Sequence, residues 1–392
     1  MKVTVIGIGQ CGCNVCDEFY AIDEYARSFF GRRIEILVEA FALNTDETDL
    51  AGLKHVPKDK RHRMVIGASI TYGHGVGKVN LDGARIMAES QSMVVDNVLG
   101  SAKFHESDAI FVIASGAGGT GSGGIGPLIK ALKDRVQKAV YAIVVLPFEY
   151  EEKGETSFAE INSATCVKTV NQYADAVFLL DNERFARADL SLGANLDHIN
   201  REMAKNFFDL FCAGEEKNTK YVGSKVLDAG DIKQTLRGIC TIGTGEVTLS
   251  SFYPLKRDDY REAAKQDISA VGALEQALNN LCLKVEPSDA SKILLLVTAP
   301  KDAITIGVIS ELSNSMLQRS PKAVIRLGDY PRRTNNISVT IILSDMTAAA
   351  RLENLYIRAA ALIKKREELS MEAKEKIRRM NETGSDIPPL IE

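Results

Sequence analysis

The chain has 392 residues, of which 45% are hydrophobic and 26% are charged, and its formal net charge is −4. This composition is typical of a globular protein with sizeable cores, and the length predicts two or three domains. A net acidic chain gives no support to a nucleic-acid partner, and no apolar run reaches the roughly 18–20 residues that span a bilayer. The N-terminus lacks a signal-peptide layout and the seven cysteines form no disulfide framework. We therefore expect a cytoplasmic protein with reduced thiols.

The first two-fifths of the chain alternates apolar strands with helices. A helix-like stretch follows the first strand and continues to about Arg27. The predicted strands are short apolar runs, and they cover residues 3–8, 34–43, 109–115, 139–146 and 176–181. Continuous apolar strands separated by helices predict a parallel sheet covered on both faces, which is a doubly wound α/β domain.

The pattern changes after the last of these strands. Residues 197–213 predict one long helix, and strands then follow one another more closely. The expected elements are a strand-rich stretch at 238–252, a helix at 259–282, a strand at 293–300, a helix at 304–318, and strands at 323–328 and 337–345. This pattern predicts a second, smaller α/β domain. A charged helix from about Ala348 to Asn381 and a disordered tail with two prolines are expected to follow.

A glycine turn follows the first predicted strand. The segment GIGQCG, Gly7 to Gly12, matches the dinucleotide pattern G-x-G-x-x-G between a strand and a helix. Glu39 and Asp46 are candidates for the acid that a nicotinamide site needs about 20 residues further on. This segment by itself therefore leaves a nicotinamide-dependent oxidoreductase open as an alternative.

A second glycine-rich segment favours a nucleoside triphosphate instead. GAGGTGSGG, Gly116 to Gly124, has six glycines in nine residues and lies between an apolar strand and an amphipathic helix. Glycines let backbone amides approach a phosphate, the helix N-terminus adds a positive dipole end, and Thr120 and Ser122 add hydroxyl donors. The segment lacks the lysine of a P-loop, so the phosphate charge has to be met by amides, hydroxyls and Mg²⁺, whose protein ligands the sequence does not identify.

Several motifs together resemble the tubulin/FtsZ superfamily of GTPases. GAGGTGSGG is similar to its glycine-rich signature, and GQCGCN at 9–14 resembles the first nucleotide loop of tubulins. Further similar segments are Asn44-Thr45-Asp46, GHGVGKVN at 73–80, PFEYEEKGETSFAE at 147–160 and LLDNERF at 179–185. The resemblance covers about residues 1–355, and its mixture of tubulin-like and FtsZ-like segments is most similar to the archaeal tubulin-like CetZ group.

The resemblance implies a binding site for GTP and GDP, with Mg²⁺ as the expected counter-ion. It assigns the phosphates to the second glycine loop, the ribose to Glu151, and the guanine edge to Asn182 and Asn200, with Asn14 near the base. The full set implied by the resemblance is Gln10, Cys11, Gly12, Cys13, Asn14, Ala117, Gly118, Gly119, Thr120, Gly121, Ser122, Glu151, Asn182 and Asn200. An asparagine amide can both donate to guanine O6 and accept from its N–H groups, a pattern that adenine does not match.

The resemblance places the catalytic groups on a distant segment. VLDAGDIKQTL at 226–236 is similar to the family loop that inserts into the nucleotide site of the next subunit, and Asp228 and Asp231 match its two acids. Carboxylates there can orient the attacking water and help hold a cation. The chain departs from the family pattern at Val226, where asparagine is usual, and at Glu155, where FtsZ proteins have an arginine. An alternative for the acid pair is a helix N-terminus favoured by the dipole.

The implied function is a GTPase that assembles with copies of itself, head to tail, into filaments that control cell shape. The alternatives are an FtsZ-type division GTPase and a non-polymerising GTP-binding regulator on the same fold. The expected organisation is a GTP-binding domain at 1–195, a central helix at 196–214, a C-terminal activation domain at 215–355, and a charged helix with a flexible tail at 356–392. The tail, through Asp386-Ile387-Pro388, faintly resembles the partner-binding peptide of FtsZ and is a candidate site for a protein partner.

Overall fold

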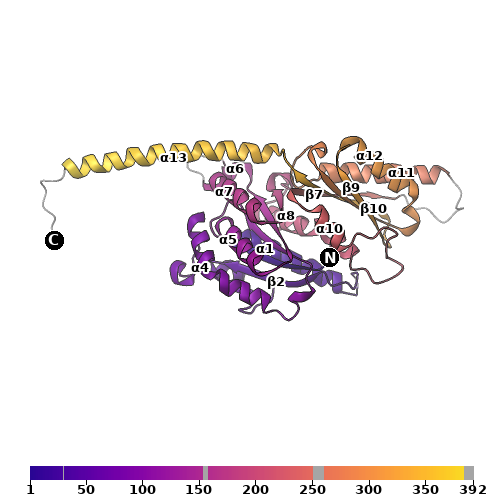
Figure 1. Cartoon of the computed structure of the whole chain (residues 1–392), viewed down its shortest axis with the longest axis horizontal. Helices are drawn as coiled ribbons and strands as arrows, with labels where there is room; N and C mark the ends of the chain where they lie inside the picture. The colour runs from indigo at the N-terminus through magenta and orange to yellow at the C-terminus, as the bar shows by residue number, and fades with distance from the viewer. Residues whose placement is uncertain (30, 153–157, 250–259, 384–392) are drawn as a thin grey trace.

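One ten-stranded sheet runs through the protein (Figure 1). The computed structural model describes residues 1–29, 31–152, 158–249 and 260–383. The strand order is β3-β2-β1-β4-β5-β6-β7-β10-β8-β9. Glu155, residues 250–252 and 259, and the tail from 384 lie outside the described residues, so the expectations for those positions stay predictions.

The first six strands form the predicted parallel sheet. They are β1 Val3–Ile8, β2 Leu37–Asn44, β3 Arg63–Val65, β4 Ala109–Ser115, β5 Ala139–Leu146 and β6 Ala176–Asp181, and each neighbouring pair is parallel. The helices between them are α1 Gly9–Arg27, α2 Glu47–Ala51, α3 Ala68–Thr71, α4 Asn80–Leu99, α5 Thr120–Arg135, α6 Glu149–Glu152 and α7 Phe158–Tyr173, with 3-10 turns η1 Phe104–Glu106 and η2 Asn182–Arg184. The doubly wound α/β prediction is therefore confirmed.

The second part of the sheet is mixed. β7 Gly238–Thr248 continues the parallel part beside β6, whereas β10 Asn336–Met346 is antiparallel to both β7 and β8 Lys292–Ala299. β9 Val324–Pro331 pairs in parallel with β8 at the edge. The helices of this part are α10 Ala229–Thr235, α11 Tyr260–Asn279 and α12 Ile306–Arg319, with 3-10 turns η3 Pro287–Asp289 and η4 Lys301–Ala303. A second α/β unit is thus present, and its strands are hydrogen-bonded directly to those of the first.

Each face of the sheet has its own apolar core. On one face, α4, α5 and α7, followed by α11, α12 and the start of the last helix, bury their aliphatic stripes against the strands. On the other face, α1 packs with two consecutive helices, α8 Leu192–Asn206 and α9 Phe208–Ala213, around a group of aromatic rings in tilted and edge-to-face contact that includes Phe19, Phe111 and Phe207. Successive residues of each strand therefore point into different cores, which is why the strand sequences are continuously apolar.

The central helix differs from the prediction in two respects. It begins at Leu192 rather than residue 197, because the Ser191 side chain caps it by accepting from the Ala194 amide at 3.3 Å. It is also interrupted at Phe207, whose amide donates to the Ala204 carbonyl at 3.2 Å in a tighter i→i+3 turn. The buried Phe207 ring packs against Phe178 and Phe211, so the local tightening coincides with an aromatic contact to the sheet.

The last helix leaves the body of the protein. α13, Ala350–Thr383, confirms the predicted charged helix, and Figure 1 shows its outer part projecting well beyond the sheet. Leu355 and Ala359 of its first turns are buried against the core, and further along the helix Arg366 lies over the Phe158 ring of α7 at 4.0 Å. Among the described helices, this one included, none is both long enough and apolar enough to cross a membrane.

Candidate functional site

The turn after β1 is built by close backbone packing. Gly9 has φ of +71°, in the left-handed region that suits glycine. A Cβ at Gly7 would lie 2.3 Å from the Gly12 carbonyl oxygen, and a Cβ at Gly12 would lie 2.2 Å from that of Ile113. The two glycines thus bring α1 against β1 and β4, and the start of α1 lies directly beside the second glycine loop, since a Cβ at Gly9 would meet the Gly121 amide nitrogen at 3.0 Å.

The loop after β4 forms the N-terminus of a helix. Its glycines lead directly into α5, which starts at Thr120, and the Gly123 amide already donates to the Gly119 carbonyl at 3.1 Å. The Thr120 hydroxyl lies 2.7 Å from that of Thr45, and the Ser122 hydroxyl donates to the Gly118 carbonyl. A Cβ at Gly118 would have no atom within 4 Å. The loop therefore presents an open backbone cradle at a helix N-terminus, an arrangement that suits a phosphate.

Asn162 holds this cradle, although sequence reasoning missed it. Its side-chain amide, on α7, donates to the carbonyls of Lys78, Ala117 and Gly118 at 2.9, 3.1 and 3.1 Å, and the residue is 1% exposed. It therefore joins the glycine loop to the segment 73–80, which the sequence had placed in the same site. The sequence carries little signal for this role of Asn162, because a single asparagine belongs to no spaced motif that would identify its hydrogen-bond acceptors.

We predict that Asn162→Ala destabilises the protein by about 1–3 kcal/mol, because it removes the amide that donates to three part-buried loop carbonyls. Chemical denaturation measures this change. Thr165→Ala is the matched control, since Thr165 is an exposed residue on the same helix and its hydroxyl donates to the Ile161 carbonyl of that helix. Equal stability of the Asn162 and Thr165 variants would contradict the clamping role.

The predicted ribose residue lies beside the first glycine turn. Glu151 is on the one-turn helix α6 and accepts from the Phe148 amide at 3.0 Å. Burial raises the pKa of the Cys11 thiol to about 12, and the neighbouring charge of Glu151 adds to that rise. The Glu151 carboxyl group is therefore close to the N-terminal turn of α1.

The three predicted base-contacting asparagines approach from different elements. Asn182 opens η2 at the end of β6, is 8% exposed, and its buried Oδ1 has no partner among the described residues. α8 lies alongside α1, because Arg201 is 3.8 Å from Glu18. Asn14 lies one turn before Glu18, nearer the glycine turn, and the buried Asn200 adjoins Arg201. The structure thus places Asn14 and Asn182 at the end of the sheet that carries both glycine loops, and Asn200 on α8 alongside α1.

The remaining residues of the predicted set complete this edge. Gln10 is exposed at the start of α1, whereas Cys13 is buried with its thiol 3.3 Å from the Leu43 carbonyl. Burial raises the pKa values of the Cys13 and Cys16 thiols. Within the described residues, no group of three or more histidine, cysteine or acidic side chains is placed to hold a metal. Cys13 therefore supports the turn by packing beneath it.

The predicted catalytic acids lie elsewhere. Asp228 is the N-cap of α10 and accepts from the Asp231 amide at 2.8 Å. Asp231 lies in the first turn, 38% of its side chain is exposed, and its Oδ1 is 3.5 Å from the Arg326 Nε. The helix-terminus alternative thus accounts for Asp228, while Asp231 keeps an accessible carboxylate.

α10 adjoins the starting end of the parallel strands. A Cβ at Gly214 would contact the backbone of both Met1 and Asp228, at 3.3 and 3.7 Å. β1 begins at Val3 beside this point and ends at Ile8, directly before the glycine turn. At about 3.3 Å per residue, a strand of this length separates the acids from the glycine loops by roughly 20 Å. Within one chain, the two halves of the predicted site are therefore on opposite ends.

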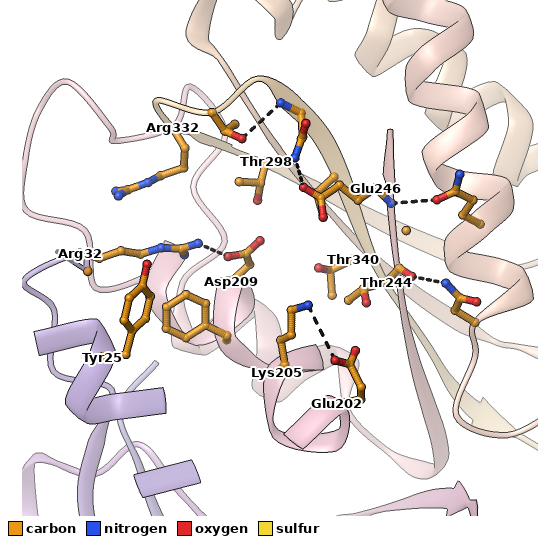
Figure 2. Close-up of a pocket in the computed structure, with 18 of the residues that line it drawn as sticks. Tyr25, Arg32, Glu202, Lys205, Asp209, Thr244, Glu246, Thr298, Arg332 and Thr340 are labelled. Carbon is orange, nitrogen blue, oxygen red and sulfur yellow. Dashed lines mark hydrogen bonds and ion pairs between the residues drawn. The ribbon is translucent and has the colours of Figure 1, made fainter. Parts of the chain in front are cut away.

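A separate cleft lies between the two parts of the protein (Figure 2). It encloses about 590 Å³ and is bordered by the end of α1, by α8, α9 and β7, and by β10 with the segment that connects it to β9. Figure 2 shows Arg32 directed at Asp209 and Lys205 at Glu202, so that the charged side chains engage each other. None of the residues predicted to bind nucleotide, all of which are described, lines it. The cleft is thus distinct from the glycine-loop edge.

Known proteins are similar to this chain in sequence and in architecture. Residues 2–188 match the Tubulin/FtsZ family GTPase domain, and residues 189–361 match the C-terminal domain of tubulin-like CetZ. The tubulin-like protein CetZ3 of Haloferax volcanii is 30% identical over 367 residues, which cover 91% of this chain and 90% of that protein. The chain belongs to the tubulin-like CetZ family.

Solved CetZ structures share the whole fold. The GDP-bound CetZ1 monomer of Haloferax volcanii superposes with a TM-score of 0.78 at 29% identity, covering 92% of this chain and 99% of that one. CetZ2 of the same organism, in a GTPγS-bound protofilament, gives a TM-score of 0.78 at 27% identity, covering 94% and 100%. The suspected CetZ resemblance is therefore confirmed, and the mixed sheet and C-terminal unit described above are those of a CetZ protein.

Proposed function

We propose that this protein is a cytoplasmic GTPase that binds GTP and assembles head to tail into filaments, hydrolysing GTP where subunits meet. Its GTPase-domain family and its similarity to nucleotide-bound CetZ proteins support nucleotide binding at the glycine-loop edge. The free state of all seven cysteines suits a reducing compartment. The observation that carries the proposal is the separation of the glycine loops from Asp228 and Asp231.

The separation requires a second subunit. An acid roughly 20 Å from the phosphate cradle cannot act on it within one chain, but stacking the α10 end of one copy on the glycine-loop end of the next brings the two halves together. Such a contact joins two different surfaces, so it repeats and generates an open filament rather than a closed dimer. The protofilament formed by CetZ2 of Haloferax volcanii supports this arrangement.

Each residue then has a defined task. The amides of residues 117–122 and the hydroxyl of Thr120 hold the phosphates, Glu151 binds the ribose, and Asn182 and Asn200 read the guanine edge. The neighbour's Asp231 orients the attacking water, and its Asp228 keeps α10 in place by capping it. The buried Oδ1 of Asn182, which has no partner in the described part of the chain, is the type of acceptor that a guanine N–H group would satisfy.

Mg²⁺ fits the donors present on this edge. Thr45, Thr120 and Asp49 place oxygen atoms beside the loop, and burial raises the pKa of Asp49 while Asn44 and Gln10 oppose that rise by hydrogen bonding. The described residues offer few carboxylates for a cation, which suits Mg²⁺ because it usually keeps several waters and binds substrate phosphates. The ion would neutralise phosphate charge, and Thr45, Thr120 and Asp49 would hold it.

The test is the dependence of GTP hydrolysis on protein concentration. If the site is shared between subunits, turnover per subunit should rise steeply as polymers form, because an isolated subunit has only half a site. Phosphate release and light scattering are measured together across a concentration series with GTP and Mg²⁺. A turnover that is constant across concentration would exclude the shared site. Binding of GTP without any scattering change would favour the non-polymerising regulator.

The cellular task that we propose is control of cell shape. CetZ membership carries this part of the proposal, and an FtsZ-type role in division is the second candidate. Imaging a tagged copy separates them, because a division protein should form a persistent ring at mid-cell. A distribution along the cell edge, with altered outline but normal division when the protein is removed, would support the shape role.

A further inference from the structure

Arg351, at the start of α13, makes a dense set of contacts with a remote part of the chain. Its Nη2 lies 2.5 Å from Glu152 Oε1 and its Nη1 donates to Glu152 Oε2 at 2.8 Å. Its Nε lies 3.2 Å from Asp181 Oδ2, and Nη2 also donates to the Pro147 carbonyl at 3.3 Å. One guanidinium thus joins the end of β5, the helix α6 and the end of β6.

These acceptors are withdrawn from solvent. Glu152 is 4% exposed and Asp181 is 7% exposed. Burial raises the pKa of Asp181, and Arg351 opposes that rise. A second arginine of the same helix, Arg358, lies 2.5 Å from Glu152 Oε2 and 2.8 Å from Glu160 Oε1. Removing the partner of a buried carboxylate is costly, so these side chains hold one geometry.

The two carboxylates are sequence neighbours of predicted nucleotide residues. Glu152 follows Glu151 on the single turn of α6, and Asp181 precedes Asn182, which opens η2. The planar guanidinium has a rigid fork of donors, so it fixes the relative orientation of the groups that it binds. A shift of Glu152 or Asp181 would therefore move the ribose-side carboxylate and the base-side amide with it.

We propose that Arg351 is a positioning residue for nucleoside recognition, which acts by holding the α6 turn and the end of β6 in register. The inference rests on the proposed function, in which Glu151 binds the ribose and Asn182 the guanine of GTP. Arg351 does not contact the nucleotide in this arrangement. It makes the root of the C-terminal helix part of the nucleotide site, although more than 150 residues separate it from either segment, 170 from Asp181 and 199 from Glu152.

The test measures nucleotide selectivity. Equilibrium dissociation constants are determined for GDP, 2′-deoxy-GDP and inosine diphosphate, with the full chain and with Arg351→Met and Arg351→Lys. We expect GDP to bind about tenfold more weakly to Arg351→Met, since small displacements of binding groups can cost up to about 10²-fold. For each analogue, the ratio of its dissociation constant to that of GDP should fall toward one. Arg351→Lys keeps the charge but loses the fork, so it should retain the fold and still lose part of the preference.

Selectivity separates positioning from general stability. Arg378→Met is the matched control on the outer part of α13, where the Arg378 partners among the described residues are Glu375 and Glu382 of its own helix. This variant should keep the wild-type ratios of the analogue dissociation constants to that of GDP. The inference is overturned if Arg351→Lys and any folded Arg351→Met retain the wild-type ratios, or if Arg378→Met loses them equally. Wild-type protein that binds no guanine nucleotide would overturn the proposed function itself, which is a different result.

Discussion

Asp231→Ala should slow GTP hydrolysis by roughly 10²-fold or more while leaving GTP affinity unchanged. The carboxylate lies on the end of the sheet opposite the glycine loops, so it has no part in binding the nucleotide of its own subunit. Its loss removes the group that we propose orients water in the neighbour's site. Filaments should persist longer because GTP remains unhydrolysed. Phosphate release, GTP binding and light scattering measured on the same sample test all three expectations.

Two further variants give this experiment its controls. Asp134→Ala removes an exposed acid on α5 and should hydrolyse GTP normally. Asp228→Ala removes the cap of α10, which is expected to cost about 1 kcal/mol in stability and to slow hydrolysis by loosening Asp231. If Asp231→Ala releases phosphate at the wild-type rate, the acid has been assigned the wrong role and the shared site needs another residue.

Gly118→Ala should leave stability unchanged and weaken GTP binding by about 1.5–3 kcal/mol, which is roughly 10- to 100-fold. A Cβ at this position would meet no atom within 4 Å, and the backbone is not in the left-handed region, so the fold has room for it. The same Cβ would occupy the space through which the loop amides reach a phosphate. Equilibrium GTP binding and chemical denaturation of one preparation separate the two effects.

Gly12→Ala is the comparison variant, because Gly12, unlike Gly118, has no room for a Cβ. Its Cβ would lie 2.2 Å from the Ile113 carbonyl oxygen, a backbone atom that cannot turn aside. Overpacking of this kind costs about 1–3 kcal/mol, so this variant should lose stability first and nucleotide binding as a consequence. A Gly118 variant that unfolds as readily as the Gly12 variant, or that binds GTP normally, would contradict the proposed phosphate cradle.

Local patterns predicted most of the elements. The predicted strands of the first half, α1, α12 and α13 carry their signal in consecutive residues, through apolar runs or, for α13, a long run of charged residues. α4 and α7 were not predicted, although the buried positions of α4, such as Ile86, Met87, Val94 and Val98, recur at helical spacing. The short strand β3 has too few residues to give any periodic signal.

The residues of the site also divide into those that local sequence patterns predict and those that they do not. Both glycine loops are contiguous segments, so the sequence shows them directly, and several of their glycines, such as Gly7, Gly12 and Gly123, are required by backbone contacts of 2–3 Å with neighbouring elements. Asn162 and Arg351 are single residues whose partners come from segments far away in the chain. Neither residue type nor spacing identifies such a partner, because many surface asparagines and arginines look the same in sequence.

The sequence alone determined the class of fold, the two glycine loops and the family resemblance, since each depends on residues that are close together in the chain. Only the tertiary structure decided which end of the sheet each group occupies. It placed Asp228 and Asp231 beside the start of β1 and the loops beyond its end, and it connected α13 to α6 and β6 through Arg351. These relations are set by parallel strand direction and by packing between distant segments, for which a one-dimensional pattern holds no signal.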